Sequence, residues 1–296
     1  MSHIAYVNGR YLPQAQAFVH IEDRGYQFGD AVYEVTCIWN GRPVDHAGHL
    51  QRLRRSLSEL RIAMPMSEAA FSAIIREVVR RNRVKKGTVY IQVGRGVSPR
   101  NHPFPVKHIR PSVVITAKHG AGPSEAVAQA GVKVAVQPDI RWGRVDIKTV
   151  GLLPNALAKQ AAVEAKAFEA LLVREDGTVT EASASNAWLV TKDKAIITHP
   201  ATNKILSGIT RATVMKLAKQ AGYTVQERAF TLDEVYAAKE FFLTGTTTFV
   251  MPVVQVGDRP VANGSPGETA LRLRQMYIDY VNGLGDEAWS SAVQSP

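Results

Sequence analysis

The sequence predicts an α+β protein built from two domains. The chain has 296 residues, which exceeds one typical domain and is enough to bury two modest hydrophobic cores. Runs of β-forming residues and segments with apolar residues at helical spacing occur together along it. The charge is unevenly divided: residues 1–118 contain 18 Lys and Arg against 8 Asp and Glu, whereas residues 119–296 contain 18 of each. This break favours a domain boundary near residue 119.

The first domain is expected to combine hairpins with helices. Two Asn-Gly pairs, Asn8-Gly9 and Asn40-Gly41, stand between β-forming residues and predict tight turns. Leucines recur at helical spacing from His46 onward until Pro65 stops the run, and Ser67 can cap a second helix. Further strands are expected at residues 88–93 and 112–116.

The segment from Gly120 to Glu125 is small, flexible and free of apolar periodicity, so it is the best linker candidate. The resulting division gives a first domain at 1–119, a linker at 120–127, a second domain at 128–283 and a flexible tail at 284–296. The second domain is expected to contain strands at residues 132–136, 170–174, 178–181, 187–190 and 240–243, and helices that begin at Pro154 and near Gly208 and that cover residues 267–281.

Lys148 and Glu181 are the candidate catalytic pair. An amine forms an imine with an aldehyde readily only when its neutral form is accessible, and the apolar and small neighbours of Lys148 favour that form by partial desolvation. The ring of pyridoxal phosphate accepts electrons only while its nitrogen is protonated, which needs an acidic partner such as Glu181. A lone lysine is more often an exposed surface residue, so this assignment depends on the motifs around it.

Five spaced motifs carry a family resemblance that spans nearly the whole chain. In order they are residues Glu22–Glu34, Asp146–Lys148, Leu152–Asn155, Thr180–Asn186 and Leu206–Arg211. This set resembles the fold type IV pyridoxal phosphate aminotransferases, and within them the D-amino acid aminotransferases. The resemblance implies a small N-terminal α/β domain, a larger C-terminal β-barrel-like α/β domain, and pyridoxal 5′-phosphate as cofactor. It also implies ping-pong transamination of D-amino acids such as D-alanine with 2-oxo acids such as 2-oxoglutarate, with Lys148 as the Schiff-base lysine and proton shuttle.

A phosphate site is predicted at one helix start. A doubly anionic phosphate requires cations and free backbone donors, and a helix that opens after a small-residue turn supplies such donors. Gly208, Ile209 and Thr210 have this character, with donors from the backbone and from the threonine hydroxyl. The sequence therefore predicts that these three residues hold the phosphate.

The resemblance adds further phosphate ligands. It implies Arg52 as the charged ligand, and Gly245 and Thr246 as part of a second loop that closes around the same group. Where the family often has serine or another hydroxyl, this chain has Ala184 and Gly245. Water is expected to replace some hydrogen bonds at those two positions, while the backbone donors remain.

Arg100 and His102 are the candidate ligands of the substrate carboxylate. The guanidinium fork of arginine matches a carboxylate bidentately. This Arg-x-His pair resembles the carboxylate trap of D-amino acid aminotransferases, whereas branched-chain L-aminotransferases and aminodeoxychorismate lyases use other residues. The resemblance also implies Tyr33 and Thr247 as substrate contacts. In the family this loop reaches the neighbouring subunit's active site, which implies a homodimer.

Two other functions remain open. A branched-chain L-amino acid aminotransferase or an (R)-amine transaminase would share the fold. A basic nucleic-acid-binding module would use the net charge of +10. Much of that charge falls on two helical patterns without interleaved aromatics, where a solvated face is expected: Arg52, Arg54, Arg55, Arg61, Arg76, Arg80, Arg81, Arg83, Lys85 and Lys86. We therefore expect amino acids and 2-oxo acids as partners, and neither nucleic acid nor membrane.

The single cysteine, Cys37, lies in an apolar run, where a buried and inert thiol is expected. The first residues lack the charged start and apolar run of a signal peptide, and the chain has no apolar stretch of spanning length. These features together predict a cytoplasmic protein. The histidines show no metal-ligand spacing, so no metal site is expected.

Overall fold

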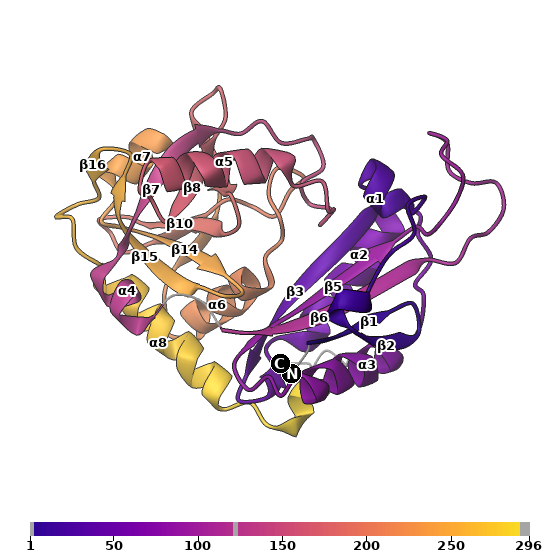
Figure 1. Ribbon diagram of the computed structural model, residues 1–296. Coiled ribbons are helices and arrows are strands. Elements are labelled where there is room, and N and C mark those ends of the chain that lie inside the picture. Colours follow the sequence, from indigo (N-terminus) through magenta and orange to yellow (C-terminus); the bar gives the residue numbers. More distant parts are fainter. Residues whose placement is uncertain (1–2, 121–123, 291–296) are drawn as a thin grey trace. The chain divides into compact units, whose positions relative to one another are not determined.

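A computed structural model describes residues 3–120 and 124–290 of the chain (Figure 1). The chain forms two compact units: residues 1–121, 147–151 and 282–296 belong to the first, and residues 122–146 and 152–281 belong to the second. Each unit combines a β-sheet with helices, which confirms the α+β class predicted from the sequence. Within the described ranges, no helix is both long and apolar enough to cross a membrane.

Six antiparallel strands form the sheet of the first unit, in the order β2-β1-β6-β5-β3-β4. Both Asn-Gly pairs make the predicted turns: φ is 47° at Asn8 and 50° at Asn40, and 97° and 77° at the glycines that follow. Positive φ at both central residues suits the twist of a two-residue hairpin. The strands are β1 (Ile4–Val7), β2 (Arg10–Pro13), β3 (Ala31–Trp39), β4 (Arg42–Pro43), β5 (Gly87–Gly94) and β6 (Ser112–His119).

Two amphipathic helices pack on this sheet. α2 (His46–Glu59) packs against β3, and α3 (Glu68–Arg81) packs against β1 and β6. α2 ends before the expected stop at Pro65, because the chain turns at Arg61, whose φ is 54°. Ser67 caps α3 as predicted, since its hydroxyl accepts a hydrogen bond from a first-turn amide at 3.2 Å. The shorter helices are α1 (Arg24–Phe28), η1 (Gln14–Gln16) and η2 (Asp286–Trp289).

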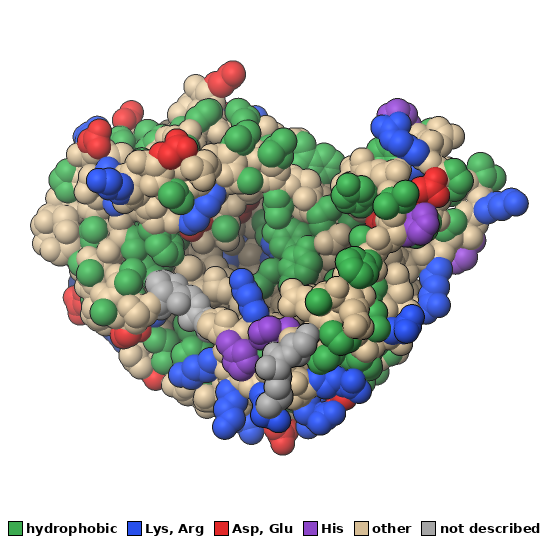
Figure 2. Space-filling view, viewed as in Figure 1, with side chains coloured by type: hydrophobic (Ala, Val, Ile, Leu, Met, Phe, Trp, Pro, Cys, Tyr) green, Lys and Arg blue, Asp and Glu red, His purple; other side chains and the backbone are tan. Residues whose placement is uncertain are grey.

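The predicted solvated basic face is confirmed except at Arg52. The other basic side chains of these two helical segments are exposed, and Figure 2 shows Lys and Arg side chains over α3. Several pair with surface carboxylates, as Arg54 does with Glu68 at 2.9 Å. Arg52 is instead buried, because it lies on the side of α2 that faces β3, where Glu34 balances its charge.

A curled mixed sheet forms the second unit (Figure 1), in the order β12-β11-β10-β14-β15-β7-β8-β9-β13, with β16 paired to β15. β7 runs parallel to both β8 and β15. The expected Asp176-Gly177 turn joins β8 to β9, with φ of 78° at the glycine. The strands are β7 (Val132–Pro138), β8 (Glu169–Val173), β9 (Thr178–Ala182), β10 (Asn186–Val190), β11 (Ile196–Thr198), β12 (Val225–Glu227), β13 (Phe230–Thr231), β14 (Glu240–Gly245), β15 (Phe249–Val256) and β16 (Arg259–Pro260).

Helices cover both sides of the second core. α5 packs on β7 and β8 through small residues such as Ala158 and Ala162, and α6 packs on β14. The predicted helix starts are confirmed, with Pro154 in the first turn of α5 and α6 beginning directly after Gly208. The helices are α4 (Glu125–Ala130), α5 (Leu153–Glu164), α6 (Ile209–Gln220), α7 (Leu232–Ala237) and α8 (Glu268–Asn282).

Two segments differ from the expected division of the chain. The linker was expected to extend through residue 127, but α4 begins at Glu125, with the Ser124 hydroxyl accepting from its first turn. The expected flexible tail contains η2, which is tied to the first unit by an Arg42–Asp286 ion pair at 3.3 Å. The remaining parts of both segments, residues 121–123 and 291–296, lie outside the described residues.

Candidate active site

The segment that carries Lys148 lies along an open edge of β3. β4 pairs only with the end of β3, so the backbone groups near Ala31 and Tyr33 need other partners. The Tyr33 N–H donates to the carbonyl of Lys148 at 3.0 Å, and the Val150 N–H donates to the carbonyl of Ala31 at 3.1 Å. This pairing places residues 147–151 in the first unit, whereas the expected domain division placed Lys148 in the second domain.

The Lys148 side chain lies against an aromatic pair. Its ammonium nitrogen is 4.2 Å from the centre of the Tyr33 ring, and the Tyr90 ring stacks on that of Tyr33 with centres 5.6 Å apart. The Lys148 N–H also donates to the Ser56 hydroxyl at 3.3 Å, which fixes the backbone from the side of α2. The structure thus brings together two residues that the sequence assigned to the site, Lys148 and Tyr33.

A buried ion pair stands next to Tyr33 in the same strand. Arg52 donates to both oxygens of Glu34 at 2.7 Å, and the Nδ1 atom of His49 lies 2.7 Å from Glu34 Oε2. Burial alone would raise the pKa of Glu34, but the charge and hydrogen bonds of Arg52, aided by His49, lower it to about 2. Sequence reasoning assigned Arg52 to a phosphate and missed both partners that hold its guanidinium in place.

The loop after β5 brings Arg100 and His102 together. Both side chains are exposed and gather on one ring: the Arg100 guanidinium lies 5.1 Å from the centre of Phe28, and the His102 ring lies 5.6 Å from it. An exposed arginine and a neighbouring imidazole can bind a small carboxylate from solvent. The pair predicted from the Arg-x-His spacing therefore forms one cluster.

In the second unit, Glu181 lies at the centre of a hydrogen-bond network. It is buried near the end of β9, and its carboxylate accepts from the Arg141 guanidinium. It also accepts from the Asn186 side-chain amide at 2.9 Å and from the Leu206 N–H at 3.1 Å. These donors hold the carboxylate in one orientation, so it can serve as a fixed acidic partner for a protonated ring nitrogen.

Arg141 is a residue of this network that sequence reasoning missed. It forms an ion pair with Asp139 at 2.8 Å as well as with Glu181. Although burial alone would lower the pKa of Arg141, the hydrogen bonds of Asp139 and the charge of Glu181 raise it. The Asp-x-Arg spacing after β7 is the local signal that could have indicated this pair. Arg141 keeps a positive charge beside Glu181, which favours the ionised carboxylate.

The start of α6 is tied to the same network. A Cβ atom on Gly208 would lie 1.9 Å from the Asn186 side-chain oxygen, so only glycine lets the chain approach so closely. Asn186 also donates to the carbonyl of Leu206 at 2.9 Å. The first amides of a helix lack acceptors within the helix, so Ile209 and Thr210 present donors at this point. The structure brings Gly208, Ile209 and Thr210 close to Glu181.

The loop after β14 lies beside the turn after β9. A Cβ atom on Gly245 would lie 3.1 Å from the Ser185 hydroxyl and 3.7 Å from the carbonyl of Ala184. The two positions at which serine is absent, Ala184 and Gly245, are therefore neighbours. Thr246 and Thr247 follow in the same loop and are partly exposed.

Glu169 holds the turn at residues 183–185 in place, and sequence reasoning missed it. It is buried and accepts from the Ala184 N–H at 2.5 Å and from the Ser185 hydroxyl at 2.9 Å. Burial raises the pKa of Glu169, and the Ala184 N–H partly opposes that rise. Nothing in its local sequence distinguishes this glutamate, because its partners come from the next hairpin.

These residues fit a phosphate-bearing pyridine cofactor. Gly208 leaves the α6 start free of a side chain, and Glu181 supplies a buried carboxylate held by fixed donors. The Thr248 hydroxyl, next to the 245–247 loop, is buried without a hydrogen-bond partner within the described chain. A buried hydroxyl without a partner is costly, which favours a ligand or water that satisfies it.

Comparisons with known proteins extend over both units. A family model described as amino-transferase class IV matches residues 31–256. The D-alanine aminotransferase of Bacillus licheniformis is 42% identical over 260 residues, which are 88% of this chain and 90% of that protein. The D-alanine aminotransferase of Staphylococcus haemolyticus is 36% identical over 276 residues, which are 93% of this chain and 97% of that protein.

Solved structures share the architecture. A branched-chain amino acid aminotransferase from the organism abbreviated T.th., solved with pyridoxamine 5′-phosphate, has a TM-score of 0.87 at 30% identity, and the match covers 98% of each chain. The relatives in sequence and the neighbours in structure thus carry names of different substrate classes.

Proposed function

The chain belongs to the amino-transferase class IV family, and from that premise we propose that it transfers amino groups between D-amino acids and 2-oxo acids with pyridoxal 5′-phosphate as its cofactor. The observation that carries the proposal is the Lys148 amine held 4.2 Å from the Tyr33 ring on β3. A lysine fixed against an aromatic ring is placed for covalent and proton-transfer chemistry.

Pyridoxal phosphate supplies an aldehyde that reacts with amines and a ring that accepts electrons from the substrate's α-carbon. Lys148 bonds to this aldehyde, and its amine, once displaced by the substrate, carries the α-proton across one face. Glu181 keeps the ring nitrogen protonated, with Arg141 and Asn186 fixing its carboxylate. The phosphate is assigned to Arg52, Gly208, Ile209, Thr210, Gly245 and Thr246.

Arg100 and His102 are proposed to bind the substrate carboxylate, with Tyr33 and Thr247 as further substrate contacts. Their gathering on Phe28 supports a single carboxylate site. The side from which a carboxylate is held decides which enantiomer presents its α-hydrogen to Lys148. The D preference is supported by this pair and by the D-alanine aminotransferases that match the chain.

A branched-chain L-amino acid aminotransferase is the second candidate, favoured by the solved structures with that name. An absorbance titration separates the two. Purified protein loaded with cofactor should show a visible band that D-alanine converts to a shorter-wavelength form, while L-alanine and L-leucine leave it unchanged. Conversion by L-leucine alone would move the assignment to the branched-chain class. A Lys148→Ala variant should lack the band that wild type shows.

We further propose a homodimer in which the loop bearing Arg100 serves the partner's active site. Several apolar side chains near α1 and this loop are exposed, as Figure 2 shows, and an exposed apolar patch favours association. They include Phe18, Ile21, Tyr26, Phe104 and Val106. The buried free thiol of Cys37 supports a cytoplasmic location, where thiols stay reduced.

Subunit mixing tests this exchange directly. Lys148→Ala and Arg100→Ala chains should each be inactive or weakly active alone. If Arg100 acts across the dimer, a heterodimer of the two variants contains one site with both native residues, so co-expression should restore activity. If Arg100 acts within its own chain, no site is intact and mixing restores nothing.

A further inference from the structure

We propose that Arg24 is the positioning residue that sets the Arg100–His102 loop in place for the substrate carboxylate. The proposal rests on the assignment of Arg100 and His102 to that carboxylate. Arg24 does not touch the substrate in this account. It acts through the backbone on both sides of the trap.

The guanidinium of Arg24 reaches the loop from α1. Its Nη1 atom donates to the carbonyl of Asn101 at 2.5 Å, and its Nη2 atom donates to the carbonyl of His102 at 3.2 Å. The Arg24 side chain is only 3% exposed, so these charge-assisted bonds are shielded from water. Two carbonyls that flank the trap are thus fixed by one rigid planar group.

The opposite side of Arg24 is held by Asp30. Arg24 Nε donates to Asp30 Oδ2 at 2.8 Å, and Asp30 directly precedes β3, the strand that carries Tyr33. The buried pair therefore connects the loop of Arg100 to the strand of Tyr33. A carboxylate bound at the loop is held in register with the strand by this connection.

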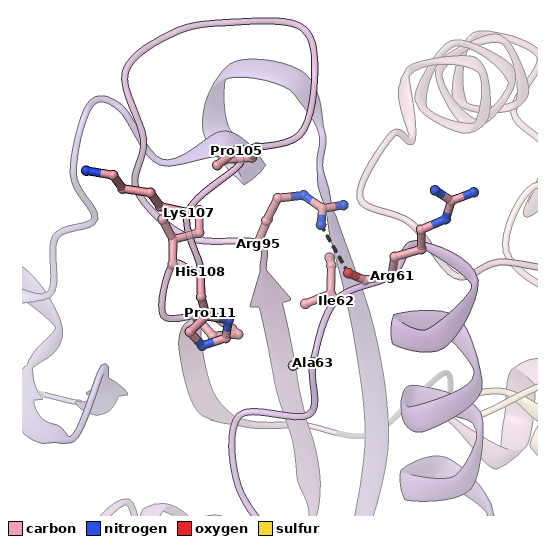
Figure 3. A pocket seen from close by; sticks show the side chains of 9 residues that line it. Arg61, Ile62, Ala63, Arg95, Pro105, Lys107, His108 and Pro111 are labelled. Carbon is pink, nitrogen blue, oxygen red and sulfur yellow. Dashed lines mark hydrogen bonds between the residues drawn. The ribbon is translucent and has the colours of Figure 1, made fainter.

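Arg95 anchors the base of the same loop. It donates to both oxygens of Asp30 at 2.7 and 2.9 Å, and to the carbonyls of Leu60 and Arg61 at 2.7 and 3.2 Å. Figure 3 shows the bond from Arg95 to the end of α2. Asp30 consequently joins two arginines, one at each end of the segment that carries the trap.

The far part of the loop has little packing beneath it. A cavity of about 170 Å³ lies between residues 105–111 and the turn after α2 (Figure 3). The cavity itself is a weak anion site, because Arg95 is committed to Asp30 and carbonyls, and the Arg61 and Lys107 side chains point away from it. With this gap on one side, the position of the trap depends on Arg24.

Phe28 places the trap side chains on the same helix. It lies four residues after Arg24 on α1, and its ring centre is 4.6 Å from the Arg24 guanidinium. Arg100 and His102 pack on this ring as well. α1 thus fixes the backbone of the trap through Arg24 and its side chains through Phe28.

Arg24→Lys is the informative variant, because it keeps the charge and removes the fork that bridges two carbonyls and Asp30. We expect the KM for D-alanine and for 2-oxoglutarate to rise about tenfold, the loss of one charge-assisted bond, with kcat changed less than about twofold. The cofactor absorbance should stay as in wild type. Lys107→Ala, an exposed charge on the same loop, is the matched control and should keep wild-type KM. An unchanged KM in Arg24→Lys would overturn the proposal.

Trypsin cleavage after Arg100 reads the loop without relying on activity. Cleavage should be about tenfold faster in Arg24→Lys than in wild type and in Lys107→Ala, because the anchored loop must open to be cut. Equal cleavage rates would show that Arg24 does not hold the loop. A loop that opens in Arg24→Lys while Arg100→Ala keeps wild-type kinetics would overturn the carboxylate assignment, and with it the role of Arg24 in substrate binding.

A double-variant cycle identifies the route of the effect. In an Arg100→Ala background, Arg24→Lys should change the KM for D-alanine less than about twofold, because the group it positions is gone. A full tenfold effect in that background would mean that Arg24 acts elsewhere, and would overturn the proposal. Failure of wild type to show the cofactor band at all would instead refute the proposed function.

Discussion

The amine of Lys148 lies 4.2 Å from the centre of the Tyr33 ring, and one backbone hydrogen bond of 3.0 Å joins the same two residues. The contact and the bond act together, because the backbone pairing fixes the height of Lys148 along β3 and the ring limits where its amine can go. This arrangement separates two roles of Tyr33, the position of its ring and the chemistry of its phenol.

Tyr33→Phe should keep the first role and lose the second. We expect kcat/KM for D-alanine to fall by about tenfold to a hundredfold, the range of a lost proton-transfer or hydrogen-bonding group, with cofactor binding unchanged. Tyr33→Leu should in addition shift the absorbance of the lysine-bound cofactor. Steady-state kinetics and spectra of both variants test this, and wild-type kcat/KM in Tyr33→Phe would exclude a role for the phenol.

Arg141 is predicted to be needed for both stability and activity. Arg141→Met would leave the Asp139 and Glu181 carboxylates buried without their cation, which costs about 3–5 kcal/mol. A less ionised Glu181 would also lower kcat. Arg144→Met is the matched control, because it removes a partly exposed pair with Asp146 at 3.0 Å that contributes about 1 kcal/mol or less. Equal urea midpoints for the two variants would contradict the prediction.

Gly208→Ala tests the close approach of α6 to Asn186. The backbone at Gly208, with φ of −66° and ψ of 136°, suits alanine, so any effect comes from the side chain. A Cβ atom must push Asn186 away, which costs about 1–3 kcal/mol and disturbs the amide that holds Glu181. We expect cofactor affinity to fall at least tenfold. Gly143→Ala, whose Cβ meets nothing within 4 Å, should bind cofactor as wild type does.

Elements set by local signals were predicted well. The two Asn-Gly turns, the Ser67 cap and the start of α6 each depend on residues within a few positions of one another. β15 was missed because Pro252 lies within it, and proline inside a run argues against a central strand. In the structure Pro252 pairs with Phe242 of β14 in the middle of the sheet.

The parts of the site that were missed are contacts between distant segments. Arg52 was expected on a solvated face, and only the packing of α2 on β3 reveals Glu34 as its partner. Glu169 meets its partners across a hairpin, and Arg141 reaches a glutamate on another strand. The residue types of the site followed from spaced motifs, whereas the residues that orient them follow from tertiary packing.

The buried Glu34 carboxylate should make the protein sensitive to acid. Its pKa is lowered from 4.5 to about 2, so its contribution to stability is present above pH 4.5 and is lost as pH falls towards 2. The shift corresponds to about 3 kcal/mol. In Glu34→Gln the free energy of unfolding should fall at pH 7, and its difference from wild type should shrink between pH 4.5 and the lowest pH at which both fold. Denaturant titrations across that range measure the difference.

Glu77 is the matched control for this carboxylate. Its pKa is also lowered to about 2, chiefly by hydrogen bonds from Arg80 and Arg81, but this cluster lies on the surface. Solvent screens such pairs, so Glu77→Gln should change acid stability far less than Glu34→Gln does. Equal effects of the two substitutions would show that burial does not decide the contribution of Glu34.

His46 should act in a different pH window. Its Nε2 atom lies 2.8 Å from the Ser72 hydroxyl, and its Nδ1 atom is buried without a hydrogen-bond partner among the described residues. Burial, and next the nearby His49, lower the pKa of His46 from 6.5 to about 4. The unfolded chain therefore binds a proton more readily, so stability is full above pH 6.5 and falls as pH drops to 4, by about 3 kcal/mol. His46→Gln should lose this dependence, whereas Ser72→Ala, which keeps the imidazole, should retain it. Denaturant unfolding between pH 7 and 4 measures both variants, and a wild-type pH slope in His46→Gln would assign the dependence to another group.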